Sequence, residues 1–235
     1  MLSFGFIFFD PLYMAMLAPV LLISVYASFK VKSTFRKFSE VRTTSGMTGA
    51  QVARLILDRN GLGDVPVERS EGMLSDHYDP MKRALRLSPD VFDRPSVAAV
   101  GVAAHEAGHA LQHQRRYAPL FLRNSIAPVA SVTTNLSTFL ILIGMIANLG
   151  GLLKVGVVLF SVGVIFTLIT LPVEFNASSR AKMILAEYGL VNPAEGEGVN
   201  QVLSAAAMTY VAATLAAIMQ LLYFLFRSGL LGGDD

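Results

Sequence analysis

The 235-residue chain contains no cysteine. It can therefore form no disulfide and offers no thiolate to a metal, so any zinc must be held by histidine and carboxylate, a donor set more typical of catalytic than of structural sites. Charged residues are also scarce, at 15% of the sequence, and the formal net charge is only +2. A charge this small argues against nucleic acid as a partner.

What the chain has in excess is apolar surface, with 53% hydrophobic residues and a mean hydropathy of +0.54. Crossing a bilayer takes ~20 residues in a helix. Four apolar stretches reach that length, near residues 8–29, 125–149, 155–173 and 205–226. The first residues lack a positively charged start, and the basic cluster at 30–37 follows the first apolar stretch. We therefore expect residues 11–29 to stay in the chain as an anchor, not a cleaved signal peptide.

The basic residues predict the topology of these spans. Of 19 lysines and arginines, only Lys154 and Arg227 fall on one side, while the rest lie in 30–123 and 180–182. The positive-inside rule makes those two segments cytoplasmic. We expect five parts: a transmembrane anchor (1–37), a cytoplasmic lobe (38–124), a transmembrane hairpin (125–173), a cytoplasmic helix (174–204), and a final transmembrane helix with its tail (205–235).

Local signals predict mixed structure in the lobe. Thr48 and Gln51 fit a capping box for a helix that ends near Arg59, before Asn60-Gly61. Short strands are expected at 65–69, 73–78 and 84–88, with a turn at Asp79-Pro80 between the last two. Pro95 is expected to open the next helix.

That helix carries the sequence His-Glu-Ala-Gly-His at 105–109. His105 and His109, four residues apart, project from one helix face and can bind one Zn²⁺, with Glu106 placed to act on a water as general base. The flanking residues are small or apolar, so the helix can be buried with only this face polar. His113 continues the spacing, but a third ligand from one helix would need sharp bending. We therefore favour a partly exposed or supporting role for it.

A catalytic zinc needs a third protein ligand on the same membrane side. Two spans separate the motif from 174–200, which returns that segment to the cytoplasmic side, and Glu174 stands at the mouth of the third span. An ionisable residue there is costly unless it is paired or metal-bound. Glu174 could simply mark the water boundary, but beside the histidine motif the sequence favours a metal ligand.

Three segments together resemble the YugP-like neutral zinc metallopeptidases of prokaryotic membranes. They are His105–Gln112, Gly72–Pro80 (Gly-Met-Leu-Ser-Asp-His-Tyr-Asp-Pro) and Glu174–Ser178 (Glu-Phe-Asn-Ala-Ser). The resemblance implies a membrane-embedded, gluzincin-type metalloprotease with Glu174 as third zinc ligand.

The last segment also resembles the Glu-x-x-Ala-Asp of type I CaaX prenyl proteases and heat-shock membrane proteases. In those families the aspartate supports a zinc histidine. Ser178 stands in its place here, and a neutral hydroxyl orients an imidazole more weakly than a carboxylate does.

Four other residues have two interpretations each. His77 is a substrate or transition-state contact, or an ordinary histidine beside a turn. Arg180 binds a substrate carboxylate or steadies an oxyanion, or is a positive-inside anchor. Tyr210 could donate to the oxyanion, although an interfacial tyrosine is more common. Asn176 is favoured as a helix-surface amide over a site hydrogen bonder.

The sequence thus predicts an α+β, helix-dominated integral membrane protein with about four transmembrane helices and a zincin-like cytoplasmic lobe with a small sheet. Its expected function is zinc-dependent hydrolysis of peptide bonds at the cytoplasmic face of a prokaryotic inner membrane. Its expected partners are membrane-associated protein or peptide substrates and the lipid bilayer. The alternative is a non-catalytic zinc sensor or scaffold, which would need the ligands but not Glu106. An ion transporter would need more polar residues within its spans.

Overall fold

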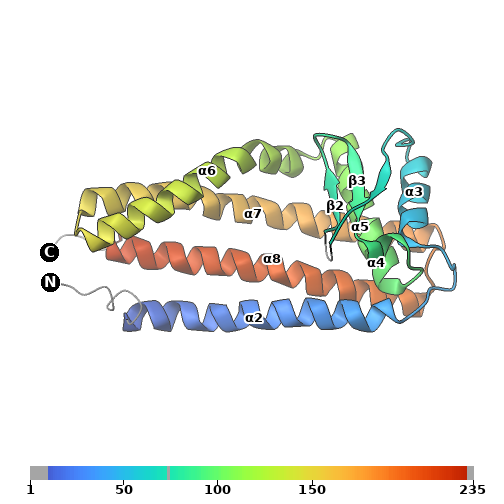
Figure 1. The fold of residues 1–235 in the computed structure, drawn as a ribbon, viewed down its shortest axis with the longest axis horizontal. Coiled ribbons are helices and arrows are strands. Elements are labelled where there is room, and N and C mark those ends of the chain that lie inside the picture. The colour runs from blue at the N-terminus through green and yellow to red at the C-terminus, as the bar shows by residue number, and fades with distance from the viewer. Residues whose placement is uncertain (1–9, 73–74, 232–235) are drawn as a thin grey trace. The chain divides into compact units, whose positions relative to one another are not determined.

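The computed structural model describes residues 10–72 and 75–231, and in them helices dominate, with one small sheet (Figure 1). The elements are α2 (Pro11–Ser39), α3 (Gly49–Arg59), β1 (Val67–Arg69), β2 (His77–Asp79), β3 (Ala84–Leu87), α4 (Pro89–Phe92), α5 (Val97–Gln114), α6 (Ala118–Ile146), α7 (Gly150–Glu187) and α8 (Pro193–Arg227). The predicted helix-dominated fold with a small sheet is confirmed.

Four of these helices, α2, α6, α7 and α8, are long and apolar enough to cross a membrane. Two of them, α7 and α8, contain the whole of a predicted apolar stretch, whereas α6 ends at Ile146 and not at residue 149. The first stretch corresponds to α2, which begins at Pro11, and residues 8–9 lie outside the described residues. Within each helix, only 11–33% of the most apolar 18-residue segment is buried inside the protein. Side chains such as Leu22 and Phe29 are 70% exposed. Such extensive apolar surface is costly in water and suits contact with lipid.

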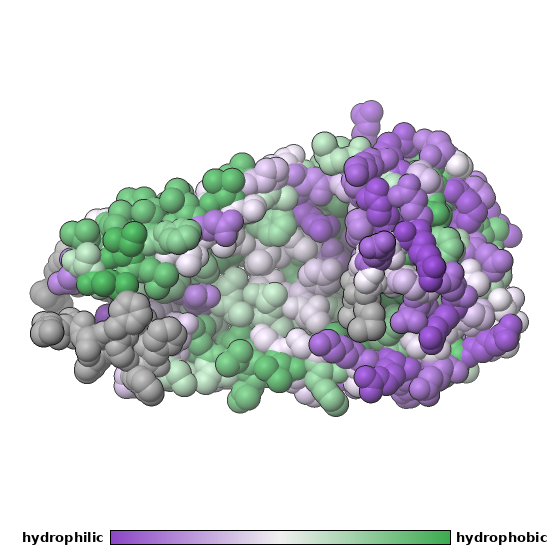
Figure 2. All heavy atoms as spheres, in the orientation of Figure 1, coloured by the Kyte–Doolittle hydropathy of each residue, from purple (hydrophilic) through white to green (hydrophobic). Residues whose placement is uncertain are grey.

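The chain divides into two compact units. Unit 1 comprises Met1–Ala27, Leu122–Leu171 and Thr209–Asp235, and unit 2 comprises Ser28–Phe121 and Pro172–Met208. In Figure 2 hydrophobic residues gather over the part of unit 1 that contains α6, whereas the visible face of unit 2 is mostly hydrophilic.

Within unit 1, glycines let α6 and α7 pack closely. A Cβ on Gly144 would lie 2.7 Å from the backbone nitrogen of Leu153, and one on Gly156 would lie 2.8 Å from a side-chain carbon of Ile141. A hydrogen bond of 2.9 Å from the Tyr223 hydroxyl to Asp10 joins α8 to the start of α2.

Within unit 2, α5 is the central element and contacts α3, α4, β2 and β3. Its side chains Val97, Val100 and Leu111 are fully buried in a core to which α3 contributes Ile56 and Leu57. The capping box predicted for α3 is present, since Thr48 and Gln51 exchange hydrogen bonds between side chain and backbone, and the helix ends at Arg59 as predicted. Gly61 follows with a φ of +71°, which suits glycine.

The three predicted strands form one sheet in the order β1-β3-β2, with β1 parallel and β2 antiparallel to β3. The predicted hairpin around Asp79-Pro80 is confirmed, and the Asp79 carboxylate accepts the backbone N–H groups of Met81 and Lys82. The strands are shorter than predicted. In the second one, residues 73–74 lie outside the described residues, and the described strand begins only at His77.

The prediction that Pro95 opens the motif helix was wrong by two residues. α5 begins at Val97, and the side chain of Ser96 caps it by accepting the N–H of Ala99. A second cap joins distant parts of unit 2, because Glu195, near the start of α8, accepts the N–H groups of Asn192 and Thr44. This carboxylate therefore holds the loop after α2 against the start of α8.

Candidate metal centre

The candidate site is built on one face of α5. His105, Gly108, His109 and Gln112 recur at the three- and four-residue spacing that places side chains on one side of a helix. Small neighbours such as Ala104 and Ala107 are fully buried, so the helix enters the core and still presents this polar face.

A glycine brings the opposing helix close to that face. A Cβ on Gly108 would lie 2.9 Å from the carbonyl oxygen of Ala177 in α7, which is closer than real Cβ contacts come. Glu174, Ala177 and Ser178 have the same three- and four-residue spacing on α7. The close approach at Gly108 therefore places Glu174 and Ser178 beside the two histidines.

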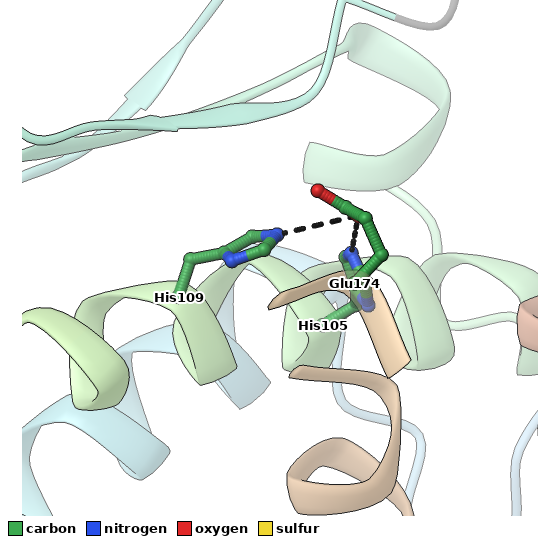
Figure 3. A group of neighbouring side chains, drawn as sticks. All are labelled: His105, His109 and Glu174. Carbon is green, nitrogen blue, oxygen red and sulfur yellow. Dashed lines mark ion pairs between the residues drawn. The ribbon is translucent and has the colours of Figure 1, made fainter. Parts of the chain in front are cut away.

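The structure brings His105, His109 and Glu174 together, the histidines from α5 and the glutamate from α7 (Figure 3). Glu174 Oε2 lies 3.3 Å from His105 Nε2 and 3.6 Å from His109 Nε2. Donors around a tetrahedral Zn²⁺ with bonds of roughly 2.0–2.1 Å lie about 3.4 Å apart. The three donor atoms all lie within 4.8 Å of one another, so their chemistry and spacing fit a metal ion.

The site is shielded from solvent, because only 13%, 10% and 3% of the side chains of His105, His109 and Glu174 are exposed. Burial by itself lowers the pKa of His109, but the contact with Glu174 and the charges of Glu106 and Glu174 outweigh burial and raise this pKa above its ordinary value. The same negative charges favour a cation between the side chains.

Each histidine is held from behind by a neutral group. His105 Nδ1 lies 3.1 Å from the Ser178 hydroxyl, and His109 Nδ1 lies 2.9 Å from Gln112 Oε1. A hydrogen bond at Nδ1 fixes the orientation of an imidazole and leaves Nε2 for a metal. Ser178 thus occupies the supporting position that its place in the sequence suggested.

Glu106 lies beside the triad and is 8% exposed. Its Oε2 accepts the backbone N–H of Tyr78 at 3.0 Å, which ties the carboxylate to strand β2. The Tyr78 hydroxyl also lies 2.8 Å from His113 Nδ1. Burial lowers the pKa of His113 below its ordinary value, and Arg83 lowers it further. The neutral ring can therefore accept a hydrogen bond from the Tyr78 hydroxyl.

His77 and Tyr210 were predicted as substrate or transition-state contacts. His77 is exposed on β2, and its Nδ1 lies 2.8 Å from the carbonyl oxygen of Ser75. Tyr210 lies on α8 within unit 1 and is 38% exposed. Substrate contact by either residue stays a prediction.

Arg180 and Asn176 are connected to the site indirectly. The Arg180 Nε–H donates to Asn176 Oδ1 at 2.7 Å, and the same oxygen accepts from Gln112 Nε2 at 3.0 Å. Asn176 is therefore not the simple helix-surface amide that the sequence favoured. A substrate contact by Arg180 stays a prediction.

Comparison with known proteins shows the family. A family model described as "Putative neutral zinc metallopeptidase" matches residues 13–229. The chain belongs to this family. It is also 54% identical over 202 residues to "Putative membrane protease YugP" of Bacillus subtilis (strain 168), a match that covers 86% of this chain and 90% of that protein. No solved structure matches the chain. The resemblance stated from the three sequence segments is thus confirmed.

Sequence reasoning missed three residues of this chain that support the candidate site. Gln112 stands three residues after His109, and that spacing was a usable signal. Gly108 was read only as small, although glycine between two zinc-binding candidates also permits close helix packing. The backbone contact of Tyr78 with Glu106 left no signal in the side chains.

We predict that Gly108→Ala loosens the site. The added methyl group must push the backbone of Ala177 away, and overpacking of this kind typically costs about 1–3 kcal/mol of stability. Zinc affinity should fall as well, because Glu174 moves with α7. Thermal unfolding in detergent and a zinc competition titration measure the two effects.

Gly101→Ala on the same helix is the matched control. The three atoms nearest to its methyl group would be side-chain atoms of Val199, the nearest at 3.3 Å, and Ala gains roughly 1 kcal/mol of helix propensity over Gly. Equal loss of zinc affinity in both variants would show that the approach of α5 to α7 does not position the ligands.

The raised pKa of His109 predicts the direction of the pH dependence of zinc binding. A metal binds the deprotonated imidazole, and a raised pKa means that protons begin to compete at a higher pH. Zinc affinity should therefore decline as the pH falls through this raised pKa, starting above the ordinary histidine value of about 6.5. Titrations of zinc across this range test the sign, and an affinity that does not change would contradict it.

Proposed function

We propose that this chain is a zinc-dependent endopeptidase that spans a prokaryotic cell membrane several times and hydrolyses peptide bonds at its cytoplasmic face. The observation that carries the proposal is the convergence of His105, His109 and Glu174 beside Glu106. Three ligands leave one tetrahedral position open, as in catalytic zinc sites.

In the proposed mechanism His105 Nε2, His109 Nε2 and a Glu174 carboxylate oxygen hold the ion. When bound, Zn²⁺ lowers the pKa of a water to about 7 and polarises the scissile carbonyl. Glu106 takes the proton of the attacking water on its carboxylate and later passes it to the leaving amine. The Tyr78 N–H keeps Oε2 of Glu106 in place, and this leaves Oε1 for proton transfer.

The sheet offers a place for an extended substrate. β2 lies at one edge of the three described strands, and Tyr78 pairs with Leu85 in the register. The Leu85 N–H donates to Pro66 on the side of β1, so the backbone polar groups of Tyr78 point away from β3. The Tyr78 N–H is bonded to Glu106, so a peptide could add to this edge by donating to the Tyr78 carbonyl, and backbone pairing of this kind tolerates many sequences. Peptides or membrane-associated proteins are thus the proposed substrates.

The proposed membrane side depends on charge. All lysines and arginines other than Lys154 and Arg227 lie in 30–123 and 180–182, and these segments carry the motif helix, the strands and the region that follows Glu174. The positive-inside rule then favours a cytoplasmic site in the cell membrane.

Two substitutions should separate metal binding from hydrolysis. We expect Glu174→Ala to lose zinc, whereas exposed Glu187→Ala on the same helix should retain it. Glu106→Gln should retain zinc and its hydrogen bond from Tyr78, but should lose about 10²–10⁴ in turnover because an amide cannot accept the proton. Metal analysis and cleavage of a peptide panel by purified protein measure both.

Each result has a distinct meaning. Zinc affinity unaffected by Glu174→Ala would remove that residue from the ligand set. Near-full turnover in zinc-loaded Glu106→Gln would exclude Glu106 as the base. A wild-type protein that binds zinc and cleaves no peptide would favour the sensor or scaffold alternative.

The absence of cysteine makes the orientation testable with single thiols. Met81 is 92% exposed in the hairpin of unit 2, and Gly151, near the start of α7, has room for a side chain. An impermeant thiol reagent applied to intact cells should label Gly151→Cys and spare Met81→Cys until the cells are opened. The reverse pattern would place the chemistry outside and replace the proposed substrates with exported proteins.

A further inference from the structure

A buried amide stands behind His109. Gln112 has no exposed surface, and its side chain makes three hydrogen bonds. Nε2 donates to the carbonyl oxygen of Val173 at 2.8 Å and to Asn176 Oδ1 at 3.0 Å, and Oε1 lies 2.9 Å from His109 Nδ1. All three are short, and the two donated by Nε2 connect α5 with α7 at the candidate metal centre.

The direction of these bonds is set by two groups with a single role each, an arginine that only donates and a backbone carbonyl that only accepts. The guanidinium of Arg180 has no acceptor, so its Nε–H, 2.7 Å from Asn176, requires the oxygen of that amide and not its nitrogen. With Asn176 Oδ1 fixed as an acceptor, the group of Gln112 facing it must be the donor Nε2. The carbonyl of Val173 imposes the same choice, because it also only accepts.

The consequence for the histidine follows from the same donor and acceptor roles. Gln112 presents its oxygen to His109, and an oxygen of a primary amide only accepts. Nδ1 of His109 must therefore carry the proton. In the neutral ring, Nε2 then carries the lone pair, and this is the atom 3.6 Å from Glu174.

The other histidine lacks such a constraint. His105 Nδ1 faces the Ser178 hydroxyl at 3.1 Å, and a hydroxyl can donate or accept. Ser178 is thus compatible with either neutral form of His105. Of the two histidines, only His109 has its protonated nitrogen dictated by the residues behind it.

We propose that Arg180 is a positioning residue that, through Asn176 and together with the Val173 carbonyl, holds the Gln112 oxygen toward His109, fixes the proton of His109 on Nδ1 and so prepares Nε2 to bind the metal. This role extends the proposed function, since it assumes that the site binds zinc. It differs from the substrate contact that the sequence suggested for Arg180, because the hydrogen bonds lead to the side of His109 away from Glu174.

Zinc affinity of the full-length protein in detergent tests the proposal. Loss of a supporting partner typically costs 10–100-fold in metal affinity, and we expect roughly this loss for Gln112→Met. The loss for Arg180→Met should be smaller but measurable, because the Val173 carbonyl still accepts from Gln112. The control is Arg115→Met. Arg115 is exposed and acts electrostatically on Arg180, but it takes no part in the hydrogen bonds that lead from Arg180 to His109. The substitution removes the same charge and should leave zinc affinity nearly unchanged.

A double variant distinguishes orientation from simple packing. Asn176→Asp replaces the amide with a carboxylate that accepts on both oxygens, so it needs no arginine to orient it. In the Asn176→Asp background, Arg180→Met should therefore cost much less zinc affinity than it does in the wild type. An undiminished loss in that background, or an equal loss in Arg115→Met, would overturn the proposal.

The tautomer can be observed directly without metal. Nitrogen NMR of ¹⁵N-histidine-labelled, zinc-free protein, recorded at a pH high enough for the His109 ring to be neutral, should show that ring protonated on Nδ1. A neutral His109 ring protonated on Nε2 would refute the inference even if zinc binds. If wild-type protein binds no zinc, the proposed function fails, but this spectrum still decides the role of Arg180. A change in KM alone on Arg180→Met, with zinc affinity intact, would instead support substrate contact.

Discussion

The close approach of α5 and α7 at Gly108 determines where the candidate ligands can stand. Glu174 follows His109 by 65 residues and lies on another helix, so no local preference holds it beside the histidines. With any side chain at 108, a Cβ would stand 2.9 Å from a backbone oxygen that cannot rotate away. The contact of glycine with Ala177 brings the backbones together, and the longer side chains of Glu174 and Ser178 then reach the histidines.

This geometry also explains how charged and polar groups are tolerated in an apolar interior. An isolated carboxylate such as Glu174, 3% exposed, would be expensive to bury. Here it faces two imidazoles, and the opposite side of each imidazole bonds to a neutral oxygen. The cost of burial is thus offset by a connected set of hydrogen bonds, and a cation at the centre would compensate the negative charge. Removing one member leaves the others buried without a partner, so the effects of substitutions in this set should not be additive.

The sequence predicted elements whose cause is local and missed those whose cause is tertiary. The capping box at Thr48, the hairpin at Asp79 and the apolar helices follow from short-range chemistry, and the structure contains them. The histidine pair was visible because helix periodicity places both on one face. The parallel pairing of β1 with β3 and the contact of Asn176 with Gln112 depend on packing between distant segments, which no local pattern encodes.

The same distinction applies to Tyr78, which couples the sheet to the motif helix through two different groups. Its backbone N–H bonds to Glu106, and its hydroxyl bonds to His113, seven residues later on α5. Two turns of helix separate these partners, about 10 Å along the axis. One residue of β2 is therefore held at two points on the helix that carries the histidines. A strand fixed in this way can neither slide nor tilt freely against α5. A peptide that paired with its edge would inherit a defined position relative to Glu106 and to the three ligands, whatever its side chains.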